Sequence, residues 1–352
     1  MTVEFTLPAA LEAHEPPEAR GRARDGVRLL VSRRATGEVS HHEFRDLPSL
    51  LAPGDLLVVN TSATLPAAVR LDRISVHFST PVPGGDDRLW IVELRRRAGK
   101  ADLPYSGGCC GEWIPMPGGA TLTLVRRHAS GRAGSSPRRE SDRLWEARLS
   151  TDVVPYLRGH GTAIRYGYVR RDWPVAAYQT VFAHDRTAGG AEMPSAGRPF
   201  TPELVTRLVS GGVLVAPITL HTGVASPEAH EPPYAERYEV PEPTAALVEH
   251  VRSRGGRVIA VGTTVVRALE TSVDASGRVQ ASAGWTEHVV TPEHGVTAVD
   301  GLLTGLHEPR SSHLMMLTAI AGTRLLAATY EAALAEGYLW HEFGDANLLL
   351  PA

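Results

Sequence analysis

The protein has 352 residues, of which 43% are hydrophobic, and a formal net charge of −3 at pH 7. This length allows two or three domains with buried cores, and the nearly balanced charge gives no global sign of a nucleic-acid partner. No stretch approaches the roughly 18 to 20 consecutive apolar residues of a membrane helix, and the first residues lack the regions of a signal peptide. A cytoplasmic protein without membrane contact is therefore expected.

The first predicted elements are strands. Residues 27–31 and 39–44 are apolar and β-branched runs on either side of a Gly-containing turn at 35–38, which predicts a hairpin. Residues 56–60 form a continuous apolar run of buried-strand length that ends at the polar Asn60. We expect this run to be a core strand.

Residues 65–150 have a different sequence pattern. Short alternating runs at 89–94, 121–125 and 143–149 are separated by Gly, Pro and Ser, a pattern typical of a small all-β unit. Its repeated arginines indicate either the solvated outer faces of strands, which we favour, or a face that binds a polyanion. The low-complexity residues 129–139 predict a mobile loop of this unit.

The two cysteines of the chain, Cys109 and Cys110, are adjacent in this region. Neighbouring Cα atoms lie only about 3.8 Å apart, a separation that strains a disulfide. The sequence therefore predicts reduced thiols.

Beyond residue 160, strands and helices alternate. The pattern predicts a helix over 201–210 with Pro202 in its first turn, a strand over 213–220, a helix over 243–254, a strand over 257–261 and a helix from 264. Such alternation is typical of a largely parallel sheet or an α/β barrel. We therefore expect an α/β main domain of residues 1–64 and 156–352, interrupted by a β domain of residues 65–155.

The strongest local pattern for ligand binding is a buried strand that runs into Gly262-Thr263-Thr264 and then a helix. Hydroxyls and backbone N–H groups would lie at the carboxyl edge of the sheet, where α/β folds bind ligands. An ordinary N-cap at Thr263 or Thr264 is the structural alternative. Arg267, one turn into the helix, either anchors a carboxylate or phosphate or forms a surface ion pair with Glu270.

Three further clusters carry groups that bind anions or move protons. His307, Ser311 and His313 precede an apolar helix, His221 ends the predicted strand 213–220 and is followed by Glu236, and Asp345 lies near the carboxyl terminus. A lone His in such a place is more often a packed or capping residue. None of the spacings gives a metal site, a P-loop or a Ser-His-Asp order, so the residues alone indicate an α/β enzyme with an inserted β domain.

Taken together, these segments resemble the S-adenosylmethionine-dependent tRNA ribosyltransferase-isomerase family of queuosine synthesis. The Gly-Thr-Thr-Val-Val-Arg motif at 262–267 is the clearest match, and all matching segments occur in the family's order. They are residues 28–31, 37–38, 42–47, 53–58, 178–183, 262–267, 284–286, 299–302, His307, Pro309, Ser311, 314–315 and 344–346.

The resemblance implies an α/β-barrel-like main domain with an inserted small β-barrel domain. It implies an enzyme that uses S-adenosylmethionine as co-substrate and no metal, and that transfers and rearranges its ribosyl part onto the aminomethyl group of a 7-deazaguanine in tRNA, releasing adenine and methionine and forming epoxyqueuosine. The site residues that we assign on this basis are His221, Glu236, His307 and Asp345 for catalysis, Gly262, Thr263, Thr264 and Arg267 for S-adenosylmethionine, and Asn60, Tyr178, Gln179 and Ser311 for the acceptor. We expect Gly262–Thr264, His307 and Glu236 to line one cavity.

The chain also departs from the family pattern. Asn60-Thr61-Ser62-Ala63 replaces Asn-Asp-Thr-Arg, Pro199 replaces a His, the segment ending at Glu236 lacks Met-His, and residues 165–169 replace Leu-Pro-Pro-Tyr-Ile. Two alternatives follow, an S-adenosylmethionine-using enzyme that acts on a small molecule in specialised metabolism, and a non-catalytic descendant that binds nucleoside or RNA. The expected partners are thus tRNA or a small-molecule acceptor, and the protein is expected to be a monomer or small homo-oligomer.

Overall fold

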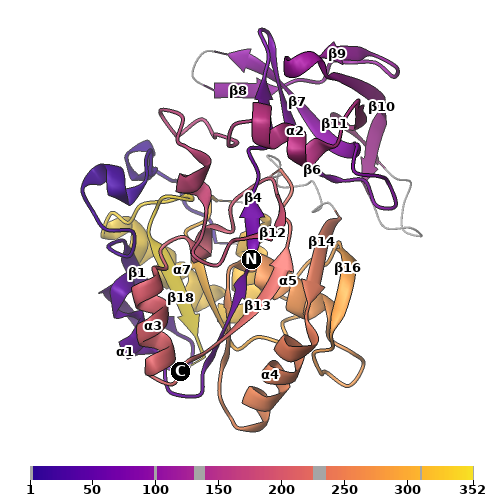
Figure 1. Ribbon diagram of the computed structural model, residues 1–352. Coiled ribbons are helices and arrows are strands. Elements are labelled where there is room, and N and C mark those ends of the chain that lie inside the picture. The colour runs from indigo at the N-terminus through magenta and orange to yellow at the C-terminus, as the bar shows by residue number, and fades with distance from the viewer. Residues whose placement is uncertain (1–2, 99–100, 131–138, 225–234, 310, 352) are drawn as a thin grey trace.

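The computed structural model describes residues 3–98, 101–130, 139–224, 235–309 and 311–351, which form two large sheets joined by a short two-stranded sheet (Figure 1). The middle of the predicted loop 129–139 lies outside these residues. Within the described residues, no helix combines the length and the apolar character that crossing a membrane requires.

The larger sheet has nine strands and a parallel centre. Strands β13, β3, β15 and β17 run parallel to one another, whereas β14 is antiparallel to β13 and β18 is antiparallel to β17. The carboxyl ends of the four parallel strands therefore share one edge with the amino ends of β14 and β18. The order across the sheet is β16 (Ser282–Thr286), β14 (Glu236–Val240), β13 (Leu214–Leu220), β3 (Leu56–Asn60), β15 (Val258–Val261), β17 (Gly301–Gly305), β18 (Ala346–Leu350), β1 (Arg28–Arg33) and β2 (Val39–Glu43).

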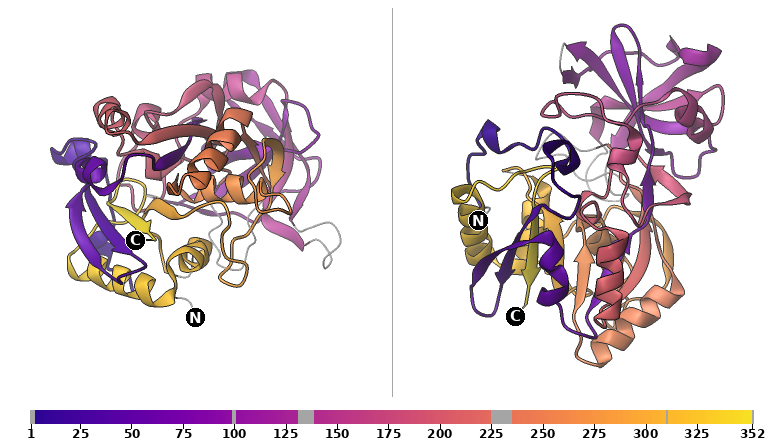
Figure 2. Two further views of the ribbon diagram at one scale, coloured as in Figure 1. Left: turned by 90° about the horizontal axis from the view of Figure 1, so that it is seen from below. Right: turned by 60° about the vertical axis from the view of Figure 1, so that its left-hand side comes forward.

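Helices cover both faces of this sheet (Figure 2). One face packs against α4 (Glu242–Ser253), α5 (Thr263–Thr271), α6 (Ser312–Ala321) and α7 (Thr323–Ala335). The other face packs against α1 (Leu47–Leu50) and α3 (Pro202–Ser210). Burial on both faces explains why β3 and β15 are continuous apolar runs without alternation.

Most of the predicted elements of the α/β part are confirmed. The hairpin forms as β1 and β2, and α3 begins after Thr201, whose hydroxyl accepts a hydrogen bond from the Leu204 amide. The predicted N-cap at Thr263 or Thr264 is wrong, because the cap is Gly262, with a φ of 99°. This left-handed backbone favours glycine and starts α5 directly at Thr263. The mixed α/β class is confirmed, and the strand pairings make an open path from β16 to β2.

The second sheet has seven antiparallel strands. They are β5 (Ala68–Arg70), β6 (Ile74–Pro81), β7 (Leu89–Ala98), β11 (Arg139–Leu149), β10 (Thr121–Ser130) and β9 (Trp113–Pro115), with β8 (Ala101–Pro104) paired to β7. Its core contains Phe78, Trp90 and Leu144, together with Leu157 of α2 (Val153–His160). The predicted boundary at residue 155 therefore falls inside a helix that packs on this sheet.

Several arginines of the second sheet have partners within that sheet. Arg95 pairs with buried Glu93, Arg126 pairs with Glu146, and the Arg127 guanidinium lies 4.1 Å from the Trp145 ring centroid. These contacts favour the interpretation of the arginine runs as strand faces. Both cysteines are free thiols, as predicted.

A third, two-stranded sheet links the two large ones. Strand β4 (Ser62–Thr64) carries the chain from β3 toward the second sheet, and β12 (His184–Gly190) lies parallel to it on the return path (Figure 1). The Gln179 carboxamide donates to the Thr64 carbonyl at 2.7 Å and accepts from the Thr64 amide at 3.0 Å. The crossing is thus fixed by a pair of hydrogen bonds that resembles one step of a strand ladder.

Asp55 and Arg257 tie the amino ends of β3 and β15 together. The guanidinium donates to both carboxylate oxygens at 3.0 and 2.5 Å, and the Ala52 amide donates at 2.8 Å. Burial opposes the charge, but the Arg257 guanidinium and the Ala52 amide hold the pKa of Asp55 below its usual value. A group with a depressed pKa stabilises the fold above its unfolded pKa and loses that contribution as the pH falls.

We predict that Asp55→Asn lowers the free energy of unfolding at pH 7 by about 2 to 3 kcal/mol, because it leaves Arg257 without its charge partner. Urea unfolding measures the change, which should shrink below about pH 4 as the wild-type carboxylate is protonated. Asp152→Asn breaks the exposed Arg88–Asp152 pair and is the control, with an expected change under about 1 kcal/mol. Equal losses in the two variants would contradict the buried role of Asp55.

Candidate functional site

Most of the predicted site residues lie at the edge of the sheet where the parallel strands end. Asn60 ends β3, His221 follows β13, Gly262 follows β15 and His307 lies two residues beyond β17. Glu236 begins β14 and Asp345 precedes β18, and both of these strands start at the same edge. The carboxylates of Glu236 and Asp345, on the antiparallel strands, therefore lie at the same edge as the imidazoles and hydroxyls that follow the parallel strands.

Asn60 holds this edge together. Its carboxamide donates to the Leu220 carbonyl at 2.9 Å and to the Thr264 hydroxyl at 3.2 Å. Its oxygen accepts from the Leu220 amide at 3.1 Å and from the Ser62 amide at 3.0 Å. The side chain is buried, and its polar groups are all used to join β3, β13, β4 and α5.

His221 is held in one orientation by its neighbours. Its Nδ1 lies 2.9 Å from the Ser62 hydroxyl, and its backbone amide donates to the Arg237 carbonyl. A Cβ at position 189 would lie 2.8 Å from Nδ1, so only glycine there leaves room for the ring. Burial, with a smaller effect from the charge of Arg237, lowers the pKa of His221 to about 4. The imidazole is therefore neutral at pH 7.

Glu236 and Arg267 form an ion pair in which both side chains are largely buried. The second Glu236 oxygen accepts from the Gly223 amide at 2.8 Å, and the guanidinium also donates to the His288 carbonyl at 3.1 Å. The alternative pairing of Arg267 with Glu270 is wrong, because Glu270 instead accepts from the amides of the segment 297–298. The charge of Arg267 is thus balanced within the protein.

The described residues that follow His221, up to Val224, also contact the second sheet. The Val224 amide donates to the Ser79 hydroxyl of β6 at 3.0 Å, and Val224 packs into the core of that sheet. A short stretch of chain therefore connects β6, Glu236 and His221.

His307 lies in a partly buried polar cluster. Its Nε2 is 2.8 Å from the Thr304 hydroxyl, and its ring stacks on exposed His313 with centroids 4.4 Å apart. The indole of Trp340 donates to its carbonyl at 3.1 Å. Burial and the nearby imidazoles of His313 and His341 hold the pKa of His307 well below its usual value. Like His221, it is a neutral ring at pH 7.

Asp345 is buried and accepts hydrogen bonds from main-chain groups. The Arg28 amide donates to one oxygen and the Leu339 amide to the other, each at 2.8 Å, and the Arg28 guanidinium lies 3.4 Å away. These contacts fix the start of β1 and the turn before β18.

The remaining acceptor candidates have different surroundings. Tyr178 is buried with its ring 5.1 Å from that of Phe343, and its carbonyl accepts from the Thr64 hydroxyl. Gln179 uses its carboxamide on β4, as described above. Ser311 precedes α6, and its buried hydroxyl has no hydrogen-bond partner among the described residues.

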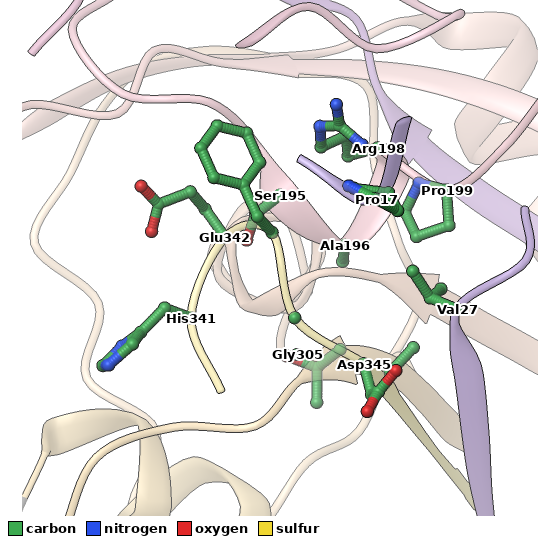
Figure 3. Close-up of a pocket in the computed structure, with 14 residues that line it drawn as sticks. Pro17, Val27, Ser195, Ala196, Arg198, Pro199, Gly305, His341, Glu342 and Asp345 are labelled. Carbon is green, nitrogen blue, oxygen red and sulfur yellow. The ribbon is translucent and has the colours of Figure 1, made fainter. Parts of the chain in front are cut away.

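The structure contains a small pocket beside the turn that leads into β18 (Figure 3). Its lining residues are Pro17, Val27, Ser195, Ala196, Arg198, Pro199, Thr304, Gly305 and 341–346. Of the predicted site residues only Asp345 lines it, so Gly262–Thr264, His307 and Glu236 do not share this pocket. Thr304 connects it to His307, and within the described part of the chain no three acidic, His or Cys side chains are placed to hold a metal ion.

The pocket brings in two residues that the sequence analysis missed, His341 and Glu342. His341 has a φ of 73°, rare for a residue other than glycine, and its ring stacks on Tyr168 with centroids 3.7 Å apart. The Tyr168 hydroxyl donates to Glu342 Oε2 at 2.5 Å. The sequence gives little signal for either, because the recognisable motif begins only at Gly344.

We predict that Asn60→Ala lowers the free energy of unfolding by about 2 to 4 kcal/mol, because buried amides and a carbonyl lose their partners. Thr264→Val removes only the bond from Asn60 to a hydroxyl and should cost about 1 kcal/mol or less. Urea unfolding of both variants checks this. A loss below about 1 kcal/mol for Asn60→Ala would mean that its carboxamide is free to bind a substrate.

Known proteins are similar to this chain over nearly its whole length. A family described as "Queuosine biosynthesis protein" matches residues 1–349. The S-adenosylmethionine:tRNA ribosyltransferase-isomerases of Heliobacterium modesticaldum and Gloeobacter violaceus are 34% and 36% identical, over 99% of this chain and 98% and 95% of theirs. The crystal structure of S-adenosylmethionine tRNA ribosyltransferase from Thermotoga maritima is similar with a TM-score of 0.54 and 27% identity, over 99% of both chains. This chain belongs to the queuosine biosynthesis protein family.

Proposed function

We propose that this protein transfers and isomerises the ribosyl part of S-adenosylmethionine onto a 7-aminomethyl-7-deazaguanine nucleotide in tRNA, forming epoxyqueuosine and releasing adenine and methionine. The observation that carries this proposal is the match over 99% of the chain, at 34 to 36% identity, to relatives named for this activity. The polar edge of the nine-stranded sheet supports it, because it gathers groups able to accept protons beside a helix start.

The sulfonium of S-adenosylmethionine makes the neighbouring C–H groups acidic, so the reaction needs a base of modest strength. We infer that His221 or His307 is this base, since both rings are neutral at pH 7. Glu236 and Asp345 accept hydrogen bonds from backbone amides with one or both of their oxygens. We therefore assign them to holding the edge in place and not to moving protons.

For S-adenosylmethionine we propose the start of α5. The first amides of a helix lack partners within the helix and favour anionic or polar groups, and Thr263 and Thr264 add hydroxyls there. Arg267 supports this site through its pair with Glu236. Among the acceptor candidates, Asn60 and Gln179 use their amides internally and Tyr178 is buried, whereas the Ser311 hydroxyl has no hydrogen-bond partner among the described residues.

We also infer that the second sheet is the inserted small β-barrel domain of the family. Its own apolar core and the paired crossings at β4 and β12 support this division. Because α2 and Ile164 belong to that core, we move the end of the inserted domain from residue 155 to about residue 164.

The test is to incubate the protein with S-adenosylmethionine alone, with a small primary amine, and with tRNA that carries the deazaguanine precursor, and to measure free adenine. Adenine that appears only with the tRNA supports the proposal. Adenine released with a small amine but not with tRNA would favour a small-molecule acceptor. No adenine in any arm, with S-adenosylmethionine still bound, would favour a non-catalytic binding protein.

We predict that replacing the true base, by His221→Asn or His307→Asn, lowers kcat for adenine release by about 100- to 10,000-fold while the Kd for S-adenosylmethionine changes little. His294→Asn, at an exposed turn, is the matched control and should keep the wild-type rate. Steady-state kinetics and calorimetry measure the two quantities. If both variants stay within about tenfold of wild type, neither imidazole is the base.

A further inference from the structure

The four predicted catalytic residues leave one chemical requirement unmet. Adenine departs more readily when a general acid protonates it. His221 and His307 are neutral rings and Glu236 is paired with Arg267, while Asp345 accepts amides on both oxygens. The two imidazoles are therefore suited to act as bases, and the two carboxylates are occupied as hydrogen-bond acceptors, so none of the four is placed to act as the acid.

Glu342 has the surroundings of such an acid. Tyr168 donates to its Oε2 at 2.5 Å, whereas Oε1 is buried and has no hydrogen-bond partner among the described residues. A buried carboxyl oxygen without a donor is far more stable as a protonated group than as part of an anion. The geometry thus leaves one oxygen occupied and one available to hold a proton.

The groups around Glu342 do not supply a full positive partner. Tyr168 and Tyr178 face it, and Arg198, the cation that acts on it, is itself bound to Glu18 at 3.0 Å. His341, beside it, is neutral at pH 7 because burial lowers its pKa to about 4. Burial, only partly opposed by the Tyr168 hydrogen bond and by Arg198, raises the pKa of Glu342 to about 7.

Glu342 is connected to the candidate base His307 through the lining of the pocket. It lines the pocket together with Thr304, whose hydroxyl contacts His307 Nε2 at 2.8 Å. Figure 3 shows the side chains of His341 and Glu342 extending to the same side of their segment, away from Val27 and Pro199. Environments that drive two neighbouring groups to opposite protonation states are typical of an acid and base pair.

We propose that Glu342 is the general acid that protonates the departing nucleobase, with Tyr168 as its positioning residue. This rests on the proposed function. The Oε1 proton passes to a nitrogen of adenine as the bond between ribose carbon and adenine nitrogen breaks, and the electron pair of that bond stays on adenine. The reaction removes one proton from the carbon beside sulfur and one from the acceptor amine. One of these restores the Glu342 carboxyl and the other leaves to solvent.

The first test detects the protonation of Glu342 without measuring enzyme activity. A group whose folded pKa is raised stabilises the fold at low pH and loses that contribution as the pH rises toward the folded pKa. The Tm of Glu342→Gln should therefore rise relative to the Tm of the wild type as the pH increases from 5 to 8. Glu331→Gln, at an exposed helical position, is the control, and its Tm should differ from that of the wild type by the same amount at every pH. Tyr168→Phe removes a bond that favours the anion, so the wild-type transition should move to higher pH. A constant difference for Glu342→Gln would overturn the proposal.

The second test uses adenine release from S-adenosylmethionine with precursor tRNA. Glu342→Gln should lower kcat by at least about 100-fold, with little change in KM, and should abolish the fall in rate above pH 7. Glu342→Asp should retain part of the rate and the alkaline fall, and Tyr168→Phe should shift that fall to higher pH. An unchanged rate in Glu342→Gln overturns the acid assignment alone. No adenine from the wild type overturns the proposed function instead, and the Tm series still decides whether Glu342 holds a proton.

Discussion

The carboxamide of Asn60 is the contact on which the rest of the site depends. One side chain binds the backbone of β13, the start of β4 and the first turn of α5, so three loops that would otherwise diverge leave the sheet at fixed positions. Because Asn60 lies at the end of β3, between β13 and β15 in the parallel centre of the sheet, the groups on either side of it are set by strand spacing and not by loop conformation. His221 and Thr264 thereby become parts of one edge, although about forty residues separate them in the sequence. Rigid placement of this kind is what general acid–base chemistry demands.

Much of the nine-stranded sheet could be predicted from local patterns. Residues 56–60, 213–220 and 257–261 are apolar enough to be buried strands wherever they are placed, and Thr201 followed by Pro202 specifies the start of α3 by its own hydrogen bonding. Gly262 was harder, because its role as a cap depends on a φ of 99° that the preceding strand imposes. The partner of Arg267 could not be found by helix spacing, since Glu236 lies on a different strand. The role of Glu342 could not be predicted from the sequence either, because only the burial produced by Tyr168 and its neighbours distinguishes it from an ordinary surface glutamate.

The segments in which the chain departs from the family pattern supply internal contacts near the site. Ser62 lies in an altered segment and holds the ring of His221, and Arg198 lies in another and binds Glu18. Tyr168 belongs to a third altered segment and binds Glu342. These substituted residues are therefore not empty positions left by lost function. Each instead forms a hydrogen bond or an ion pair within the fold.

The segment from His221 to Val224 has a mechanical consequence. Its far end is hydrogen bonded to Ser79 and packed in the core of the second sheet, while its near end carries an imidazole whose ring has only the space that Gly189 leaves. A stretch of four residues cannot absorb a displacement of several ångströms by extending, since each residue spans at most about 3.6 Å. Any displacement of the second sheet relative to the nine-stranded sheet would consequently also change the orientation of the His221 ring.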